Sequence, residues 1–228
     1  MTEGCKFDKE KQNQIVSFSG GKDSTAMAIL HPEIPLAHFN TGWEFPEMIE
    51  HVKPFSPTIL HPRHTFDSLA IKWGWPSMFK RWCTREKIDA LNKNAKGKRQ
   101  LIGFTIDEIK RCSTKEMLKK KIPPRFPLIE RNMSKQDTLH LCTENGYTWN
   151  NLYTTIDSRI SCYCCPLKGS PRVWQRIRKQ YPELWEKMLW LDEKITQAGN
   201  NRGFYGYKTV HDLENRFEYE DRQEVLNF

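Results

Sequence analysis

The sequence lacks any long apolar segment. None of its runs approaches the roughly 18–20 apolar residues of a membrane-spanning helix, so we expect no membrane helix. The opening residues MTEGCKFDKEKQNQ contain no apolar stretch of the kind found in a cleaved secretory signal. Repeats of fixed period and low-complexity tracts are also absent, which argues against solenoid arrays. We therefore expect a globular protein of the cytoplasm.

Cysteine is sparse but unevenly placed. The seven cysteines are an odd number, and without an export signal they are expected to stay reduced, as metal ligands or nucleophiles. Cys162, Cys164 and Cys165 fall within four residues, and Cys83 lies far upstream. Because thiolates suit both iron and zinc, this set predicts a [4Fe–4S] cluster, with Zn²⁺ as the alternative. Cys142 is expected in the core.

Charge and apolar content set the class of protein. The chain has 36 Lys and Arg against 28 Asp and Glu, a net charge of +8, and 38% hydrophobic residues. This composition supports a packed core and excludes a disordered polyelectrolyte. Basic runs at residues 93–99, 110–121 and 172–179 fit either solvated surfaces or phosphate neutralisation, which charge alone does not separate.

Short apolar segments alternate with helical patterns in the first half of the chain. We expect strands at residues 15–18, 36–40, 58–60 and 99–104, and helices at 25–30, 46–53 and 85–94. This alternation predicts an α/β fold with a mostly parallel twisted sheet and helices on both faces. Residues 10–170 are expected to form this α/β domain.

The sequence of the second half of the chain predicts more helix than that of the first half. Residues 115–127 are expected to be a loop or lid and residues 127–130 a strand, and Ser134 is expected to cap a helix over 135–145. Ser170 and Pro171 predict a helix start, and an apolar stripe over residues 174–191 indicates helix broken near Pro182. We expect residues 171–228 to be a helical, Cys-rich extension packed on the first domain, with its last thirty residues peripheral.

The most informative segment is residues 15–24 (IVSFSGGKDS), a strand followed by two glycines and a helix. Two glycines permit a tight turn whose N–H groups face an anion, and the helix directs its positive end to the same place. Lys22 adds a charge, and Asp23 is suited to capping the helix or holding Mg²⁺. Since Asp23 stands where a Walker A loop needs a hydroxyl, a Walker A loop is excluded.

The hexapeptide SGGKDS in this setting resembles the PP-loop of the ATP pyrophosphatase superfamily. Four later segments resemble the phosphoadenosine phosphosulfate (PAPS) reductase-like family, in family order over about residues 15–180. Residues 39–47 (FNTGWEFPE) are similar to D-T-G-x-x-F-P-E, with Asn40 replacing the acid, and residues 81–87 (RWCTREK) are similar to C-T-x-x-x-K. Residues 102–111 (IGFTIDEIKR) resemble G-x-x-x-D-E-x-x-R, and residues 153–166 resemble R-x-x-C-x-x-C-P.

This resemblance implies a site for ATP, PAPS or adenylyl-sulfate (APS), with Mg²⁺. The nucleotide-binding residues that it implies are Ser19, Gly20, Gly21, Lys22, Asp23, Ser24, Asn40, Thr41, Gly42, Arg85, Lys87, Gly103 and Arg111. Lys22, Asp23 and Cys165 are the expected catalytic residues, and Cys83, Cys162, Cys164 and Cys165 the expected metal ligands. Because Trp82-Cys83 replaces the tandem cysteines of cluster-bearing relatives, the fourth ligand is Cys164, Cys112 or an open position.

Two enzymatic functions and one binding function follow. The first is an ATP-dependent sulfurtransferase that releases AMP and pyrophosphate, with a nucleic acid or a small molecule as acceptor and a protein as one source of sulfur. The second is a PAPS or APS reductase, but the chain has no cysteine after Cys165 to match the C-terminal nucleophile of such enzymes. A non-catalytic nucleic-acid-binding module explains the charge but not SGGKDS. We therefore expect the sulfurtransferase.

Overall fold

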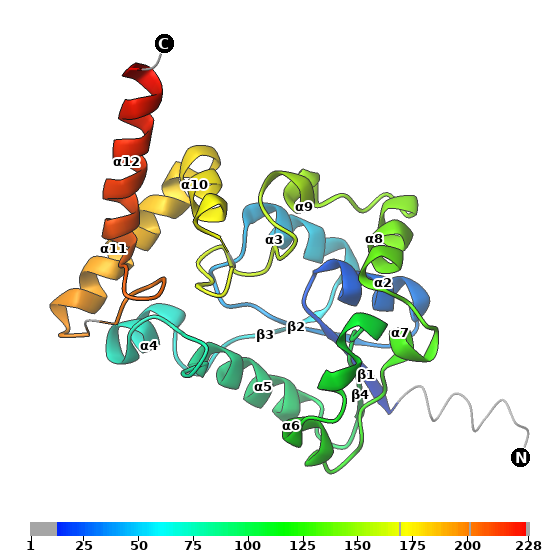
Figure 1. Ribbon diagram of the computed structural model, residues 1–228. Coiled ribbons are helices and arrows are strands. Elements are labelled where there is room, and N and C mark those ends of the chain that lie inside the picture. Colours follow the sequence, from blue (N-terminus) through cyan, green and yellow to red (C-terminus); the bar gives the residue numbers. More distant parts are fainter. Residues whose placement is uncertain (1–12, 169, 201, 227–228) are drawn as a thin grey trace, which may run out of the picture. The chain divides into compact units, whose positions relative to one another are not determined.

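The computed structural model describes residues 13–168, 170–200 and 202–226. Its contacts separate the chain into two compact units (Figure 1). The sheet unit contains residues up to 40, 44–61 and 87–151, and the helical unit contains residues 41–43, 62–86 and 152 onward. Segments of the two units therefore alternate along the chain. The division into domains 10–170 and 171–228 stays a prediction.

The secondary-structure elements follow an α/β order in the first half of the chain and are helical in the second. In chain order they are β1 (Gln14–Phe18), α2 (Lys22–Leu30), β2 (Leu36–Phe39), α3 (Pro46–Val52), η1 (Lys53–Phe55), β3 (Thr58–Leu60), α4 (Phe66–Trp73), α5 (Trp82–Asn94), β4 (Arg99–Leu101), η2 (Ile106–Arg111), α6 (Lys115–Leu118), α7 (Pro127–Glu130), α8 (Lys135–Glu144), η3 (Trp149–Asn151), α9 (Leu152–Thr155), α10 (Pro171–Gln180), α11 (Pro182–Gln197) and α12 (Val210–Leu226).

The four named strands form one parallel sheet in the order β3-β2-β1-β4. Val16 of the central strand pairs with Leu36 on one side and with Leu101 on the other. Since parallel neighbours need crossover connections, helices separate successive strands. The carboxyl ends of all four strands lie at one edge, which is where open α/β sheets bind ligands. The predicted α/β fold class is confirmed.

Helices cover both faces of this sheet (Figure 1). On one face Leu91 and Ala95, from the end of α5 and the turn after it, pack against Ile15 and Ala37. On the other face α2 packs against β1 and α8 packs against α2. Because both faces are covered, the central strand is apolar rather than alternating, as the sequence IVSF indicates.

Three predicted segments differ from the structure. Residues 127–130 form the short helix α7 rather than a strand, because Pro127 has no N–H to donate and occupies the first helical turn. The expected fifth strand is reduced to a single parallel bridge between Leu101 and Arg125. β4 ends at Leu101 instead of reaching residue 104, and the predicted loop over residues 115–127 contains the one-turn helix α6.

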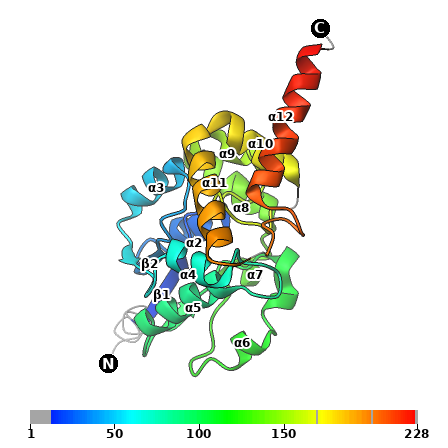
Figure 2. The same ribbon diagram turned by 90° about the vertical axis from the view of Figure 1, so that its left-hand side faces the viewer.

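The helical unit is built around α11, which packs against α4, α10 and α12 (Figure 2). The predicted helix start is confirmed, since the Ser170 hydroxyl accepts from the Arg172 N–H at 3.3 Å. The predicted break near Pro182 separates α10 from α11. Asp192 is buried and accepts from the indole of Trp75 at 2.7 Å and from the Val210 N–H at 2.9 Å. One buried carboxylate thus ties α11 to the loop after α4 and to the start of α12.

The last thirty residues are not peripheral where the structure describes them. Val210, Leu213 and Phe217 are buried, because α12 presents an apolar face to α11, and Phe204 is buried against the rings of Trp75 and Trp174. A Cys-rich helical extension is not confirmed, since residues 162–165 lie in turns ahead of α10. None of the described helices combines the length and the hydropathy that crossing a bilayer requires.

Candidate functional site

The loop between β1 and α2 is held by serine hydroxyls. The Ser19 N–H donates to Ser24 Oγ at 3.1 Å, and the Ser24 hydroxyl donates to the Gly21 carbonyl at 2.9 Å. Gly20 has a φ of +77°, which glycine adopts without strain. Gly21 is the N-cap of α2 and no side chain caps it, a helix start of the kind to which anions bind. The strand, the turn and the helix start lie where the sequence predicts them, and phosphate binding by this loop stays a prediction.

Lys22 and Asp23 form an ion pair at the start of α2. Lys22 Nζ lies 2.9 Å from Asp23 Oδ1, and the side chains are only 12% and 26% exposed. The same oxygen accepts from the Thr138 hydroxyl of α8 at 2.7 Å. Asp23 Oδ2 has no hydrogen-bond partner in the described part of the chain. Asp23 therefore does not cap the helix, and its second oxygen remains suited to a cation.

A buried thiol lies beneath the same turn. The Cys142 thiol of α8 donates to the Lys22 carbonyl at 3.3 Å and is fully buried, as expected for a core cysteine. Burial, with a further contribution from the charge of Asp23, raises the pKa of Cys142 to about 12. Cys142 is therefore a neutral thiol that supports the loop backbone and is not a nucleophile.

Aromatic residues that the sequence analysis missed hold the other side of the loop. The indole of Trp149 donates to the Gly20 carbonyl at 2.7 Å, and the Thr25 hydroxyl donates to the same carbonyl at 3.3 Å. Thr25 Oγ1 lies 2.9 Å from His51 Nε2, and the His51 and Trp149 rings are 4.7 Å apart. Burial lowers the pKa of His51 to about 4, so its imidazole is neutral at pH 7.

Trp149 reaches Gly20 through an unusual turn. Trp149, Asn150 and Asn151 have φ values of +48°, +49° and +66°, three successive left-handed residues without glycine. Each such residue costs roughly 1–2 kcal/mol, less for asparagine, so surrounding contacts must hold this turn. The Asn-Asn pair is the only sequence feature that favours such a turn, and it does not indicate which side chain would reach the loop.

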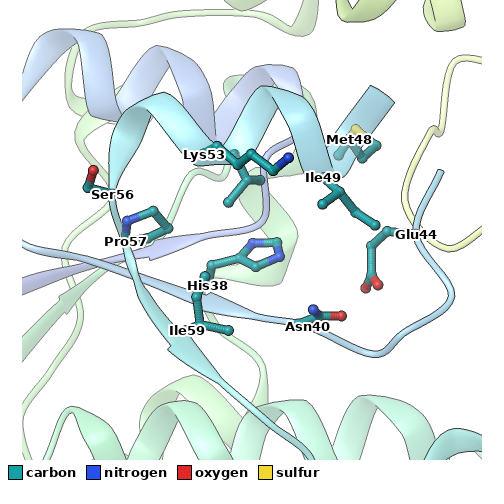
Figure 3. A pocket seen from close by; sticks show the side chains of 10 residues that line it. His38, Asn40, Glu44, Met48, Ile49, Lys53, Ser56, Pro57 and Ile59 are labelled. Carbon is teal, nitrogen blue, oxygen red and sulfur yellow. The ribbon is translucent and has the colours of Figure 1, made fainter. Parts of the chain in front are cut away.

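A cavity of about 320 Å³ lies between the sheet and α3 (Figure 3). His38 rises from β2 toward α3, Asn40 and Glu44 lie at one end, and the other walls are mainly apolar. Burial lowers the pKa of His38, which keeps its ring uncharged at neutral pH. Met48 also lines the cavity, and its Cε would lie 3.2 Å from a Cβ on Gly20. The cavity therefore adjoins the loop and suits an uncharged ring with hydrogen-bonding groups.

The other predicted nucleotide-binding residues of the sheet unit differ in what their atoms contact. A Cβ on Gly103 would lie 3.1 Å from the Asp23 carbonyl, so Gly103 permits the close approach of β4 to the loop. Lys87 lies near the sheet, where its charge is a minor contributor to the lowered pKa of His38, after burial. Arg111 is held by Glu108 at 2.6 Å and by the Phe104 ring at 4.1 Å.

Three predicted nucleotide-binding residues, Thr41, Gly42 and Arg85, belong to the helical unit. Thr41 Oγ1 accepts from the Trp43 N–H at 3.1 Å, and the Gly42 carbonyl accepts from Lys187 Nζ at 3.2 Å. Arg85 is exposed near the start of α5. The structure therefore places the predicted nucleotide residues in two units, and the loop residues gather in the sheet unit together with Asn40, Gly103 and Lys87.

The clustered cysteines occupy tight turns of the helical unit. The Cys165 N–H donates to the Cys162 carbonyl at 3.3 Å, and the Lys168 N–H donates to the Cys165 carbonyl at 3.1 Å. Thr41 Oγ1 lies 3.4 Å from Cys162 Sγ, and Cys164 is fully buried. The Lys168 ammonium is buried beneath this turn and donates to the Arg159 carbonyl.

Cys83 lies close enough to Cys165 for their charges to interact. Burial raises the pKa of the Cys83 thiol, and the neighbouring Cys165 raises it further. Cys112, the alternative fourth ligand, belongs to the sheet unit. Within the described ranges, no group of three or more His, Cys, Asp or Glu side chains is arranged to hold a metal ion. The donor chemistry suits iron or zinc, but the arrangement does not complete a ligand set.

Comparisons with known proteins agree with the loop geometry. The sequence profile of the phosphoadenosine phosphosulfate reductase domain matches residues 13–168, which is more than half of the chain. Two proteins of Methanocaldococcus jannaschii, the uncharacterized proteins MJ0973 and MJ0066, are each 28% identical to this chain, over 218 and 203 residues. These matches cover 85% and 79% of this chain but 51% and 42% of the relatives, so the chain spans about half their length. The chain belongs to the phosphoadenosine phosphosulfate reductase domain family, the PAPS reductase-like branch of the PP-loop superfamily, which binds adenine nucleotides.

Proposed function

We propose that the chain binds ATP at the loop of residues 19–24 and transfers its adenylyl group to an acceptor that then receives sulfur. One observation carries the proposal: the start of α2 has no side-chain cap, and the Ser19 and Ser24 hydroxyls and the Lys22–Asp23 pair all belong to this one turn after β1. Backbone N–H groups and a lysine at a helix start stabilise phosphate charge. The resemblance of this loop to PP-loops directs the chemistry to the α-phosphate.

In the adenylation step an acceptor oxygen attacks the α-phosphorus. The bond from the α-phosphorus to the bridging oxygen breaks, and pyrophosphate leaves with the electron pair. Lys22 and the N–H groups at the start of α2 would stabilise the charge that develops on the non-bridging oxygens. Mg²⁺ supplies Lewis-acid charge compensation when bound, and Asp23 Oδ2 is the oxygen that would hold it.

In the sulfur step a sulfur nucleophile displaces AMP from the adenylated acceptor. With hydrosulfide as the source, one carbon–sulfur bond forms, the carbon–oxygen bond to AMP breaks, and no oxidant or reductant is needed. In a chain without the metal group proposed below, Cys165 is the thiol that we propose to deliver sulfur when a protein persulfide is the source. The outer sulfur of the Cys165 persulfide attacks the carbon, AMP leaves, and a mixed disulfide joins Cys165 to the acceptor. A second thiol then attacks the Cys165 sulfur and releases the thiolated acceptor, and an external dithiol reduces the intramolecular disulfide that remains. Cys162, one turn away, is suited to that resolving role.

The cavity beside the loop is the proposed site of the adenine ring. Its apolar walls, the neutral His38 ring and the Asn40 amide suit an uncharged heterocycle. Met48 lines the cavity, and its Cε would lie 3.2 Å from a Cβ on Gly20, so the proposed base site and the phosphate loop have this residue as a common neighbour. Replacing Asn40 by Leu is expected to weaken ATP binding more than inorganic pyrophosphate binding.

We retain the proposal of a [4Fe–4S] cluster, with Zn²⁺ as the alternative, whose ligands are Cys83, Cys162, Cys164 and Cys165. Their support is the soft donor type and the charge interaction between Cys83 and Cys165, which is a smaller cause of the raised Cys83 pKa than burial. Because the described geometry gathers no three ligands, no step above passes through a metal. Metal analysis and an absorption spectrum of anaerobically purified protein test this ligand set, and a preparation without iron or zinc would contradict it.

The adenylation proposal is tested with radiolabelled ATP in the presence of RNA or small-molecule acceptors. Lys22→Met is expected to weaken ATP binding roughly 10-fold or more, because a charge-assisted phosphate contact is lost. Asp23→Asn is expected to abolish AMP formation while leaving much of the ATP affinity. Lys194→Met, which removes an exposed lysine of the helical unit, is the matched control. AMP release at the unchanged rate in both loop variants would refute the proposal.

The alternative is reduction of PAPS or APS, which the description of the family profile favours. Sulfite formation from either sulfonucleotide with a dithiol reductant, without AMP formation from ATP, would replace the first proposal by the second.

A further inference from the structure

A tight turn of the helical unit exposes two large apolar side chains. It joins α4 to α5, and the Ser77 N–H donates to the Lys80 carbonyl while the Lys80 N–H donates to Ser77 Oγ, both at 3.1 Å. Met78 and Phe79 stand at the tip and are 71% and 100% exposed. A single exposed apolar residue is ordinary, but a fully exposed ring beside an exposed methionine is typical of a binding surface.

Buried tryptophans anchor both ends of this turn. The Trp75 indole donates to Asp192 at 2.7 Å, and the Trp82 indole donates to the Gly74 carbonyl at 3.2 Å. Both tryptophans are almost completely buried. Because both ends are held, the exposure of the tip is built into the fold, and little conformational entropy would be lost when a partner binds.

The surroundings of the tip are basic. Residues 68–85 contain four basic residues and no acidic residue, and Asp67 and Glu86 stand directly outside this range. The ammonium groups of Lys72 and Lys80 each lie 5.5 Å from the centre of the Trp73 ring. Arg81 and Arg85 are exposed and lie one helical turn apart, since the Arg85 N–H donates to the Arg81 carbonyl at 3.2 Å. An aromatic tip within a positive surface is complementary to a polyanion that carries flat rings.

We propose that this turn is a binding surface for single-stranded nucleic acid. Unpaired bases stack on Phe79, and the backbone phosphates contact Lys72, Lys80, Arg81 and Arg85. Stacking rings combined with cations are how proteins bind single strands without reading sequence. Arg81 and Arg85 lie on either side of Cys83 in the chain, so the surface identifies the acceptor class of the proposed function and rests on that function for its role. The binding itself does not depend on nucleotide chemistry.

The test uses the full chain and a fluorescein-labelled single-stranded RNA of about 15 nucleotides, with affinity measured by anisotropy. Phe79→Ala is expected to weaken binding by about 5-fold to 150-fold, the loss of one stacked base. Phe79→Trp is expected to retain it. Tyr207→Ala removes another fully exposed ring of the same unit and is the matched control, expected to change affinity less than twofold. Arg81→Gln is expected to lower the slope of log affinity against log salt by about 0.7.

Circular dichroism melting of each variant confirms that it is folded. Equal RNA affinity in Phe79→Ala and wild type, an equal loss in Tyr207→Ala, or tighter binding of duplex than of single strand would overturn the proposal. Binding to anionic phospholipid vesicles but not to RNA would overturn it as well. ATP binding is measured in parallel. If Phe79→Ala loses RNA affinity and keeps its ATP affinity, the result supports the RNA surface. If Lys22→Met keeps its ATP affinity, the result refutes the nucleotide site and leaves the RNA surface untouched.

Discussion

Replacing Trp149 by Phe tests whether a long-range hydrogen bond positions the nucleotide loop. The substitution keeps an aromatic ring beside His51 and removes the indole N–H that donates to the Gly20 carbonyl at 2.7 Å. The carbonyl then retains the Thr25 hydroxyl as a donor, at the longer distance of 3.3 Å. Because Gly20 lies in the middle of the phosphate loop, its peptide orientation decides where the neighbouring N–H groups point.

The expected cost follows from the remaining donor. A buried acceptor left without a partner costs about 1–3 kcal/mol, and a typical hydrogen bond contributes about 1 kcal/mol net. With Thr25 still in place, we expect the free energy of unfolding to fall by about 1–2 kcal/mol. For a chain of this size that corresponds to a melting temperature lower by about 2–8 °C. If the same loss acts on the loop in its binding geometry, ATP affinity falls about 5- to 30-fold.

Trp174→Phe is the matched control. Trp174 is fully buried, and its indole nitrogen has no hydrogen-bond partner in the described ranges, so the change removes similar ring volume without removing a bond. Thermal melting and isothermal titration with ATP are measured for both variants and for Trp149→Phe combined with Thr25→Val. The two loop changes are expected to be non-additive because they share one acceptor. An unchanged ATP affinity in Trp149→Phe, or an equal loss in Trp174→Phe, would refute the reasoning.

Two further predictions concern the same region. Gly20 and Gly42 both have a φ of +77°, but a Cβ would lie 2.8 Å from Val52 Cγ2 at Gly20 and within 4 Å of nothing at Gly42. Gly20→Ala should therefore cost about 1–3 kcal/mol more in unfolding free energy than Gly42→Ala, and equal melting temperatures would contradict this. Burial lowers the pKa of His51 from 6.5 to about 4, so the unfolded chain takes up this proton first as the pH falls. The contribution of neutral His51 to the free energy of unfolding is fully present above about pH 6.5. It falls as the pH is lowered toward 4, by at most about 3 kcal/mol and by less with solvent screening. His51→Gln should flatten this decline in urea unfolding experiments, and an identical acid slope in both proteins would show that another group is responsible.

The sequence by itself determined the local features of this protein. Residues 15–24 give a strand, a double-glycine turn and a helix start because each depends on backbone geometry and on hydrogen bonds between neighbours. The capping box at Ser134 and the Pro171 helix start were predictable for the same reason. The alternation of strands and helices likewise determined the parallel α/β class, because parallel strands need crossover helices.

Only the tertiary structure decided which distant side chains surround the loop. Trp149, Thr138 and Cys142 each contact the loop or its helix start from more than one hundred residues away. Their placement depends on how helices pack in three dimensions, and a short-range sequence pattern does not specify which distant side chains then meet. The same limit explains residues 127–130, where Pro127 begins a helical turn and pairing with the sheet is limited to one bridge at Arg125. It also applies to the cysteines, whose spacing indicates metal ligands although three thiolates converge on one ion only if the folded backbone brings them together.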